Sequence, residues 1–198
     1  MMDLNDGTAA VRTARCVITQ EATGKPMMHI MRFSCNEPSG VFVTISTFPE
    51  LELRGCIGYP EPSFPLSEAL ELAARSACHD PRFQDMKEHE LDNIVVEVTV
   101  LTPPEPIVVE DKEDLLNNIK IGRDGLMLEY RGMRGLLLPQ VPVEWGWSVK
   151  EYLENLCRKA GIDKDKWKDK GCRIFSFRGQ IFKEISPKGE VAEVRQCW

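Results

Sequence analysis

Two glycines, a cation and a thiol lie within the six-residue segment LRGCIG (53–58). If the segment is a strand, Arg54, Cys56 and Gly58 share one face, because side chains alternate across a sheet. A guanidinium near a thiol favours the thiolate, the nucleophilic form of cysteine. The glycines would let a ligand approach the backbone closely. Cys56 is therefore a candidate nucleophile, with Arg54, Gly55 and Gly58 as candidate binding positions.

The segment HDPRF (79–83) contains the partners that a nucleophilic cysteine needs. A histidine oriented by a carboxylate is the usual activating base, so His79 and Asp80 are candidate catalytic residues. Arg82 is a candidate for binding a substrate or a partner. We expect the two segments to meet in one site.

Two further polar residues interrupt apolar segments. Glu97 lies within IVVEVTVL, where a buried carboxylate would need a partner or a shifted pKa. Gln140 ends LLLPQ, and its amide can donate hydrogen bonds to a ligand. Both are candidate positions for substrate or partner binding.

The same residues also fit purely structural roles. Free cysteine is often buried and packs as a small apolar side chain. The glycines fit a β-bulge or a close crossing, and Asp80 before Pro81 fits a turn. Glu97 fits an exposed position if its side of the sheet faces water. The sequence leaves these alternatives open.

Several common cofactor sites are missing from the sequence. It contains no CxxC, HExxH, GxGxxG, Walker or GxSxG pattern. The seven cysteines, at 16, 35, 56, 78, 157, 172 and 197, are odd in number and widely spaced, unlike a secreted disulfide framework. No cofactor is evident, and no metal site is predicted.

Composition indicates an ordinary globular protein. The chain has 198 residues, 42% of them hydrophobic, and a formal net charge of −6. This charge does not support nucleic-acid binding by bulk electrostatics, although a local basic groove stays open. With no apolar leader and no long apolar run, we expect an intracellular, cytoplasmic protein without membrane contact, or a nuclear one in a eukaryote.

Periodicity and turn signals predict the elements. Helices are expected at 8–21, 65–78 and 111–119 and behind the capping box Ser148–Glu151. Strands are expected at 39–47, 51–60 and 93–101, as a meander within 119–140, and as a hairpin around Arg178-Gly179. The clustering of strands favours an α+β fold with a mixed or antiparallel sheet packed with helices.

The order of these segments resembles the AMMECR domain family, named for a human chromosomal-deletion syndrome. The similarity runs through GVFVTI, LRGCIGYPEP, DPRF, ELDNIVVEVTVLTPP, IGRDGLML and GLLLPQVPVEWGW, and LRGCIG is the family hallmark. The resemblance implies one domain over 8–185 with a larger lobe holding both chain ends. We expect an interior smaller lobe at about 60–95 and a polar tail at 186–198.

The family has no established biochemical activity, so the resemblance implies a broad intracellular role only. In prokaryotes its members are associated with Memo-type and radical-SAM proteins, which are candidate partners. Two hypotheses remain. The chain is an enzyme with a cleft around LRGCIG that modifies RNA, protein or a small molecule, or it is a non-catalytic binding module that works with partner enzymes or nucleic acid.

Overall fold

The computed structural model describes residues 2–26, 34 and 36–194. These residues form two compact units, the first from residues up to 102 together with 180–194, and the second from residues 103–179. The interior segment with its own core is therefore 103–179. The predicted lobe at 60–95 falls inside the first unit, because its helix packs against the N-terminal helix and the same sheet.

The first unit is a five-stranded sheet with two long helices. Its elements in chain order are α1 (Leu4–Thr23), β1 (Val41–Thr47), β2 (Leu53–Tyr59), α2 (Leu66–Ala77), η1 (Glu88–Asn93), β3 (Ile94–Leu101), β8 (Gly179–Glu184) and β9 (Val191–Val194). The strand order is β2-β1-β3-β8-β9. The strand β3 is therefore central, and β2, with LRGCIG, lies at the edge.

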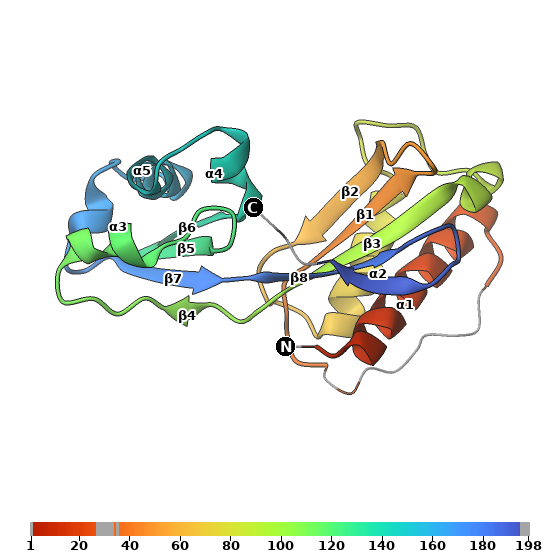
Figure 1. Cartoon of the computed structure of the whole chain (residues 1–198), viewed down its shortest axis with the longest axis horizontal. Helices are drawn as coiled ribbons and strands as arrows, with labels where there is room; N and C mark the ends of the chain where they lie inside the picture. The colour runs from red at the N-terminus through yellow and green to blue at the C-terminus, as the bar shows by residue number, and fades with distance from the viewer. Residues whose placement is uncertain (1, 27–33, 35, 195–198) are drawn as a thin grey trace. The chain divides into compact units, whose positions relative to one another are not determined.

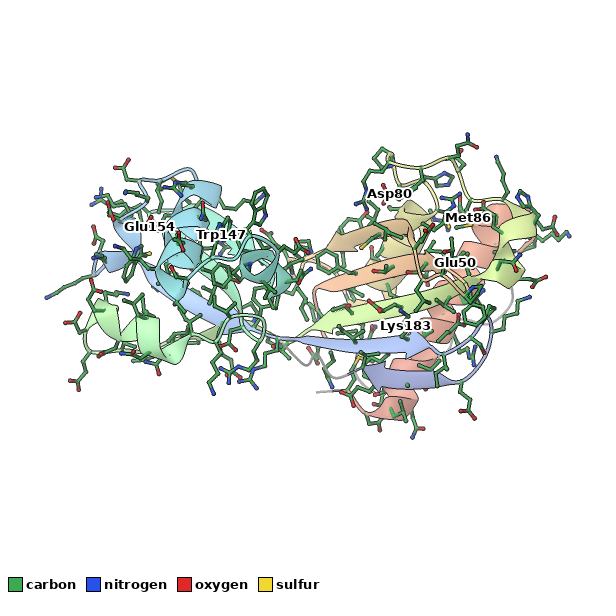
Figure 2. All side chains as sticks on the ribbon, turned by 45° about the horizontal axis from the view of Figure 1, so that its top comes forward. Glu50, Asp80, Met86, Trp147, Glu154 and Lys183 are labelled. Atoms are coloured by element: carbon green, nitrogen blue, oxygen red, sulfur yellow. The ribbon has the colours of Figure 1, made fainter. Side chains whose placement is uncertain are left out.

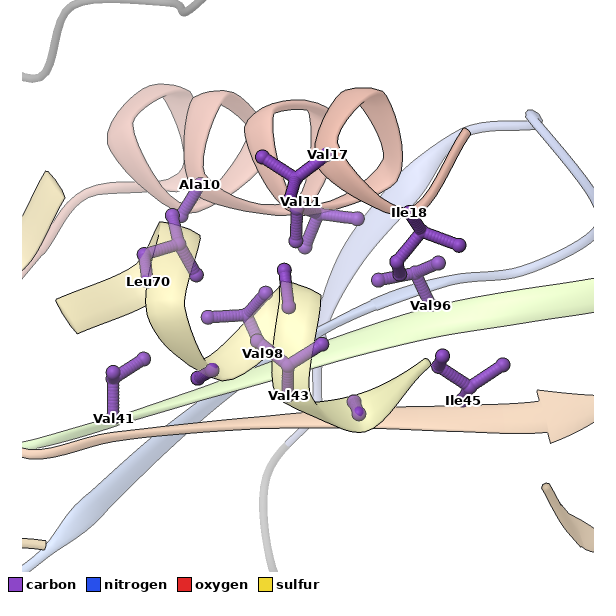
Figure 3. Close-up of a cluster of buried hydrophobic side chains, with 14 of the residues drawn as sticks. Ala10, Val11, Val17, Ile18, Val41, Val43, Ile45, Leu70, Val96 and Val98 are labelled. Atoms are coloured by element: carbon purple, nitrogen blue, oxygen red, sulfur yellow. The ribbon is translucent and has the colours of Figure 1, made fainter. Parts of the chain in front are cut away.

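Both helices of the first unit cover the same face of this sheet (Figure 1). The covered face carries Val43 of β1 and Val98 of β3, which pack with Ala10, Ile18 and Leu70 of the helices (Figure 3). Val43 and Val98 are paired across β1 and β3. Their neighbours in sequence therefore point to the opposite side, which we call the helix-free face.

The first helix is defined at both ends by its sequence. Asp3 accepts a hydrogen bond from the Asp6 backbone N–H at 2.8 Å and so caps the N-terminus. Gly24 follows the last turn with a φ of 68°, a left-handed conformation that glycine adopts without steric cost. The helix expected at 8–21 is confirmed and begins earlier, at Leu4.

A buried ion pair connects α1 to β8. Glu184 is 1% exposed and accepts hydrogen bonds from Arg15 and from the backbone N–H of Val96. Arg15 also donates to the carbonyls of Leu91 and Ile94. Because both charges have several partners, the pair is compatible with burial.

The second unit has its own sheet and core. Its elements are β4 (Glu105–Pro106), η2 (Lys112–Asp114), α3 (Leu115–Asn118), β5 (Gly125–Tyr130), β6 (Met133–Leu137), α4 (Gln140–Glu144), α5 (Val149–Lys159), η3 (Lys166–Lys168) and β7 (Arg173–Phe177). The strand order is β4-β7-β5-β6. The capping box Ser148–Glu151 begins α5, as predicted.

Two expectations for the C-terminal region were wrong. The segments 173–177 and 179–184 do not form a hairpin, because β7 pairs with β5 in the second unit whereas β8 belongs to the first. Arg178-Gly179 joins two sheets instead of making a turn. The predicted polar tail contains β9, which pairs with β8 from Val191 to Val194. Residues 195–198 of that tail lie outside the described part of the chain.

Candidate functional site

The hexapeptide LRGCIG forms β2, and its pairing with β1 is irregular at Arg54. Ile45 of β1 is paired with Gly55, whereas the next residue, Ser46, is paired with Leu53. Arg54 is therefore the extra residue of a β-bulge, which redirects a side chain locally. The predicted simple alternation is lost at this position, and Leu53 is 43% exposed.

The Arg54 side chain anchors the segment that precedes β3. It donates to Glu90 of η1 at 2.6 and 3.0 Å and to the Gln84 carbonyl at 2.9 Å. Burial favours the neutral form of Glu90, but the hydrogen bonds from Arg54 and from the Lys87 backbone hold its pKa below the usual range. A guanidinium bound in this two-pronged way is fixed in orientation. Arg54 therefore connects β2 to η1.

The HDPRF segment covers the free edge of β2 through the Cys56 backbone. The Cys56 N–H donates to the Asp80 carboxylate at 2.9 Å, and Arg82 donates to the Cys56 carbonyl at 3.3 Å. Arg82 also donates to Asp80 at 2.7 Å, and these bonds hold the pKa of Asp80 well below its usual range. The two segments do meet, as expected, but through backbone groups.

Gly55 is required by the close approach of the α2 C-terminus. A Cβ at this position would overlap the carbonyl oxygen of Ala77, and the Asp80 Cβ lies 3.7 Å away. Gly55 thus lets α2 end directly beside β2, which brings Asp80 to the strand edge (Figure 2). Gly58 has a different neighbour, since a Cβ there would overlap the Phe42 ring. Both glycines serve packing.

The Cys56 thiol lies on the helix-free face and is half-buried. Its Sγ accepts a hydrogen bond from the Thr44 hydroxyl at 3.2 Å. Thr44 is the partner of Cys56 on one side and of Glu97 on the other. Lys183, labelled in Figure 2, lies with its Nζ 3.8 Å from the Glu97 carboxylate. Cys56, Thr44, Glu97 and Lys183 form one line across β2, β1, β3 and β8, here called the thiol row.

Glu97 is the titratable acid of the thiol row. Its side chain is 24% exposed, and burial raises its pKa, while the Lys183 ammonium partly opposes the rise. A carboxyl group that is poorly solvated and has only one distant cation is unusual for a strand that merely supports a core. Glu97 is therefore a partly buried carboxyl group with a raised pKa.

His79 does not contact the thiol in the described structure. Its Nδ1 lies 2.9 Å from Asp85 and its Nε2 lies 3.4 Å from Glu21. Hydrogen bonds to these two acids raise its pKa, so it holds its proton more firmly than an ordinary histidine. Both ring nitrogens are occupied, which makes His79 a poor base for Cys56. The expectation of a Cys56–His79 pair oriented by Asp80 is thus not met by the geometry.

Comparison with known proteins identifies the family. The model of the AMMECR1 family matches residues 11–182. The chain belongs to the AMMECR1 family. It is 54% identical to a protein of Methanocaldococcus jannaschii over 196 residues, covering 98% of this chain and 97% of that protein. A protein of Methanocella arvoryzae is 50% identical over 197 residues, covering 98% of both.

A solved structure from the same family has the same fold. It is the crystal structure of an uncharacterised Pyrococcus horikoshii protein, with a TM-score of 0.75, 42% identity and 98% coverage of both chains. These relatives bear no named activity. Membership of the AMMECR1 family therefore establishes the fold, and the chemistry of the site must be argued from its own residues.

The remaining candidates are not members of the thiol row. Gln140 begins α4 in the second unit and is half-buried. Among the other cysteines, Cys78 is buried, which raises its pKa to about 12, and Cys35 and Cys197 lie outside the described residues, as does His29.

The described residues contain neither a metal-binding cluster nor a membrane-spanning helix. No group of three or more His, Cys, Asp or Glu side chains is arranged to hold a metal ion in residues 2–26, 34 and 36–194. Within the same residues, no helix is both long enough and apolar enough to cross a membrane.

Sequence reasoning missed Thr44, Glu90 and Lys183. Thr44 is unremarkable within VFVTIST, and only its pairing with Cys56 and Glu97 gives it a role. Glu90 lies in a short 3-10 helix that has no strong periodicity. A cross-strand alignment of β1, β2 and β3 would have found Thr44, since antiparallel partners share a face.

Proposed function

We propose that the protein is an enzyme that transfers an acyl or similar electrophilic group through the thiol of Cys56. The observation that carries this proposal is the thiol row, in which a thiol, a hydroxyl, a carboxyl and an ammonium lie on one face of one sheet. An intracellular location, where thiols stay reduced, suits such chemistry.

The Thr44 hydroxyl holds the thiol in place. It donates to the Cys56 sulfur at 3.2 Å, and a nucleophile held in one orientation needs less reorganisation to attack. Cys56 is half-buried, so a substrate reaching the helix-free face can contact the sulfur. Thr44 would therefore position Cys56, a role that the sequence suggested for a histidine.

Glu97 would act as the proton donor. Because burial raises its pKa, it keeps a proton nearer to neutral pH than an ordinary glutamate, as a general acid requires. The thiolate attacks the electrophilic carbon, a carbon–sulfur bond forms, and the leaving group departs with the proton of Glu97. Water or an acceptor then attacks the thioester and gives its proton to the Glu97 carboxylate. The carbon–sulfur bond breaks, the group is released, and both the thiolate and the protonated Glu97 are restored.

The proposal is tested with a reactive acyl donor of general use. The whole chain is incubated with p-nitrophenyl acetate, and the acetylated residue is located by peptide mapping. We expect an acetyl adduct on Cys56 that forms faster than any adduct on Cys16, which is also half-buried. Cys56→Ser should abolish it and Cys16→Ser should not. Equal labelling of the two cysteines would rule out a specially reactive Cys56.

A second candidate function rests on a surface pocket beside η1. This pocket has a volume of about 320 Å³, and its lining residues are Arg54, Phe83, Gln84, Asp85, Lys87, His89 and Glu90. It would receive a side chain of a partner, in line with a binding module for Memo-type or radical-SAM proteins. Phe83 offers an apolar wall, with Arg54 and Arg82 5.9 and 5.7 Å from its ring centre.

The binding candidate needs variants that do not disturb the fold. Arg54 anchors β2 to η1, so Lys87→Gln and His89→Gln, both at exposed positions, are better probes. If the pocket binds a purified Memo-type or radical-SAM protein, these variants weaken capture while Cys56→Ser leaves it unchanged. Equal capture by all the variants would remove the pocket from the interface.

A further inference from the structure

The second unit has a sheet face that its helices leave uncovered. In the described residues of this unit, α5 packs against β5 and β6 from the side of Leu126 and Leu128, which are fully buried (Figure 1). The alternation of a strand puts Met127 and Glu129 on the other side. We call that side the outer face.

An apolar row crosses the outer face. The register pairs Met127 of β5 with Leu136 of β6 and with Phe175 of β7, and Phe175 with Pro106 of β4. The row therefore extends over all four strands of the sheet, and three of its members are only partly buried, with Pro106 exposed. Neighbouring strands are about 4.8 Å apart, so the row is about 14 Å long.

A charged row lies directly beside the apolar one. Arg134 of β6 and Arg173 of β7 are the two partners of Glu129, and both form ion pairs with it. The arginine side chains are 63% and 69% exposed, whereas Glu129 is 15% exposed. Each guanidinium has five N–H donors, so one carboxylate leaves donors free on both. The row has a net positive charge that faces solvent.

The net charge of the chain hides a difference between its units. Residues 103–179 contain 14 lysines and arginines against 13 acidic residues, whereas the rest of the chain contains 11 against 18. The acidic balance that argued against nucleic-acid binding thus belongs to the first unit. It does not describe the outer face of the second.

We propose that the outer face binds single-stranded nucleic acid. Bases would stack on Phe175 and lie along the apolar row, while Arg134 and Arg173, about 10 Å apart across two strand spacings, would contact phosphates. Aromatic side chains on an open antiparallel sheet are a common means of binding unpaired bases. The Arg173 guanidinium already lies 5.6 Å from the Phe175 ring centre. A duplex keeps its bases stacked on each other and so cannot use the apolar row.

The binding test uses a fluorescently labelled oligouridylate of about ten nucleotides and the whole chain, with anisotropy as the readout. We expect Phe175→Leu, which keeps an apolar side chain, to weaken binding about tenfold. The double change Arg134→Gln with Arg173→Gln should also lower the slope of log affinity against log salt by about 1 to 2. Arg158→Gln on α5, an exposed arginine on the other side of the sheet, is the matched control and should bind normally.

The possible outcomes distinguish single-stranded nucleic acid from other ligands of the outer face. Normal binding by Phe175→Leu, or an equal loss in Arg158→Gln, would overturn the proposal. Competition by polyglutamate as strong as by unlabelled oligouridylate would show an acidic-peptide surface and overturn it too, as would equal affinity for a duplex. If the double arginine variant does not fold, Phe175→Leu still decides the case, because it leaves the ion pairs of Glu129 intact.

Discussion

The Asp80 carboxylate accepts a hydrogen bond from the Cys56 backbone N–H at 2.9 Å. Arg82, bound to the same carboxylate, donates to the Cys56 carbonyl. The loop that follows α2 thus provides β2 with the hydrogen-bond partners that an edge strand lacks. The relationship explains how the DPRF and LRGCIG segments contact each other. Because only the Cys56 backbone takes part, the Cys56 side chain can lie on the helix-free face.

Loss of this edge contact should destabilise the fold. Asp80→Ala leaves the partly buried Cys56 N–H and the exposed Arg82 guanidinium without their acceptor. We expect the free energy of unfolding to fall by about 1–3 kcal/mol. Urea denaturation followed by circular dichroism measures the change. Asp85→Ala removes an acid whose side chain is 64% exposed and bonded to His79, and should cost much less, because exposed ion pairs contribute little to stability. Equal losses for the two variants would contradict the assigned role of Asp80.

The same carboxylate should make stability depend on acidity. Hydrogen bonds from Arg82 lower the folded-state pKa of Asp80, so its contribution is complete above the unfolded pKa of about 3.9 and is lost as the pH falls toward the folded value. Asp80→Asn should therefore lose less stability than the wild type below about pH 4. Parallel pH profiles for the two proteins would contradict this.

Gly55 should tolerate no side chain. An added Cβ would overlap the Ala77 carbonyl oxygen, so Gly55→Ala forces α2 away from β2 and should cost about 1–3 kcal/mol or more. Gly171→Ala is the comparison, because the nearest atom to a Cβ there is 3.6 Å away. That variant should unfold within about 0.5 kcal/mol of the wild type. A larger loss of stability in Gly171→Ala than in Gly55→Ala would show that the C-terminus of α2 can shift at little cost.

Much of the fold could be predicted because many of its elements are determined by local sequence patterns. The apolar run in β3 and the capping box that begins α5 are signals within a few residues, and both predicted the structure correctly. The hairpin around Arg178-Gly179 was wrong because turn residues also occur where a chain passes from one sheet to another. No local pattern distinguishes these two cases.

The candidate site was only partly predictable for a similar reason. Cys56, Asp80 and Arg82 were found by residue type, and they do lie together. Their contacts depend on a bulge at Arg54 and on the close approach of α2, both of which are tertiary. Thr44 has no chemical signal of its own and enters the site through strand register.

The Thr44 hydroxyl should control the reactivity of the thiol. Thr44→Val keeps the shape but removes the donor 3.2 Å from the sulfur, so the sulfur loses the hydrogen bond that holds it in position. We expect iodoacetamide to alkylate Cys56 several-fold more slowly at neutral pH, with Thr44→Ser close to the wild type. Mass spectrometry gives the rates, with Cys16 as the internal standard. An unchanged rate in Thr44→Val would show that the hydroxyl only fills space.

The partly buried Glu97 of the thiol row should reduce the stability of the protein at neutral pH. Because burial raises its folded-state pKa, the folded state holds a proton that the unfolded state releases above about pH 4.3. The unfolded state then binds fewer protons, so stability falls as the pH rises from that value through the folded pKa. Glu97→Gln cannot ionise and should gain stability relative to the wild type over this window.

Thermal and urea unfolding at pH 4 and pH 8 would measure this gain, which should appear at pH 8 and shrink at pH 4. Glu88→Gln, at a carboxylate whose side chain is 63% exposed, should show no comparable change with pH.

The Lys183 ammonium lies 3.8 Å from Glu97 and favours the charged carboxylate. Lys183→Met should therefore lower the stability at pH 8 more than at pH 4, and the loss should be small when Glu97→Gln is also present. A loss of the same size in both backgrounds would show that Lys183 acts independently of Glu97.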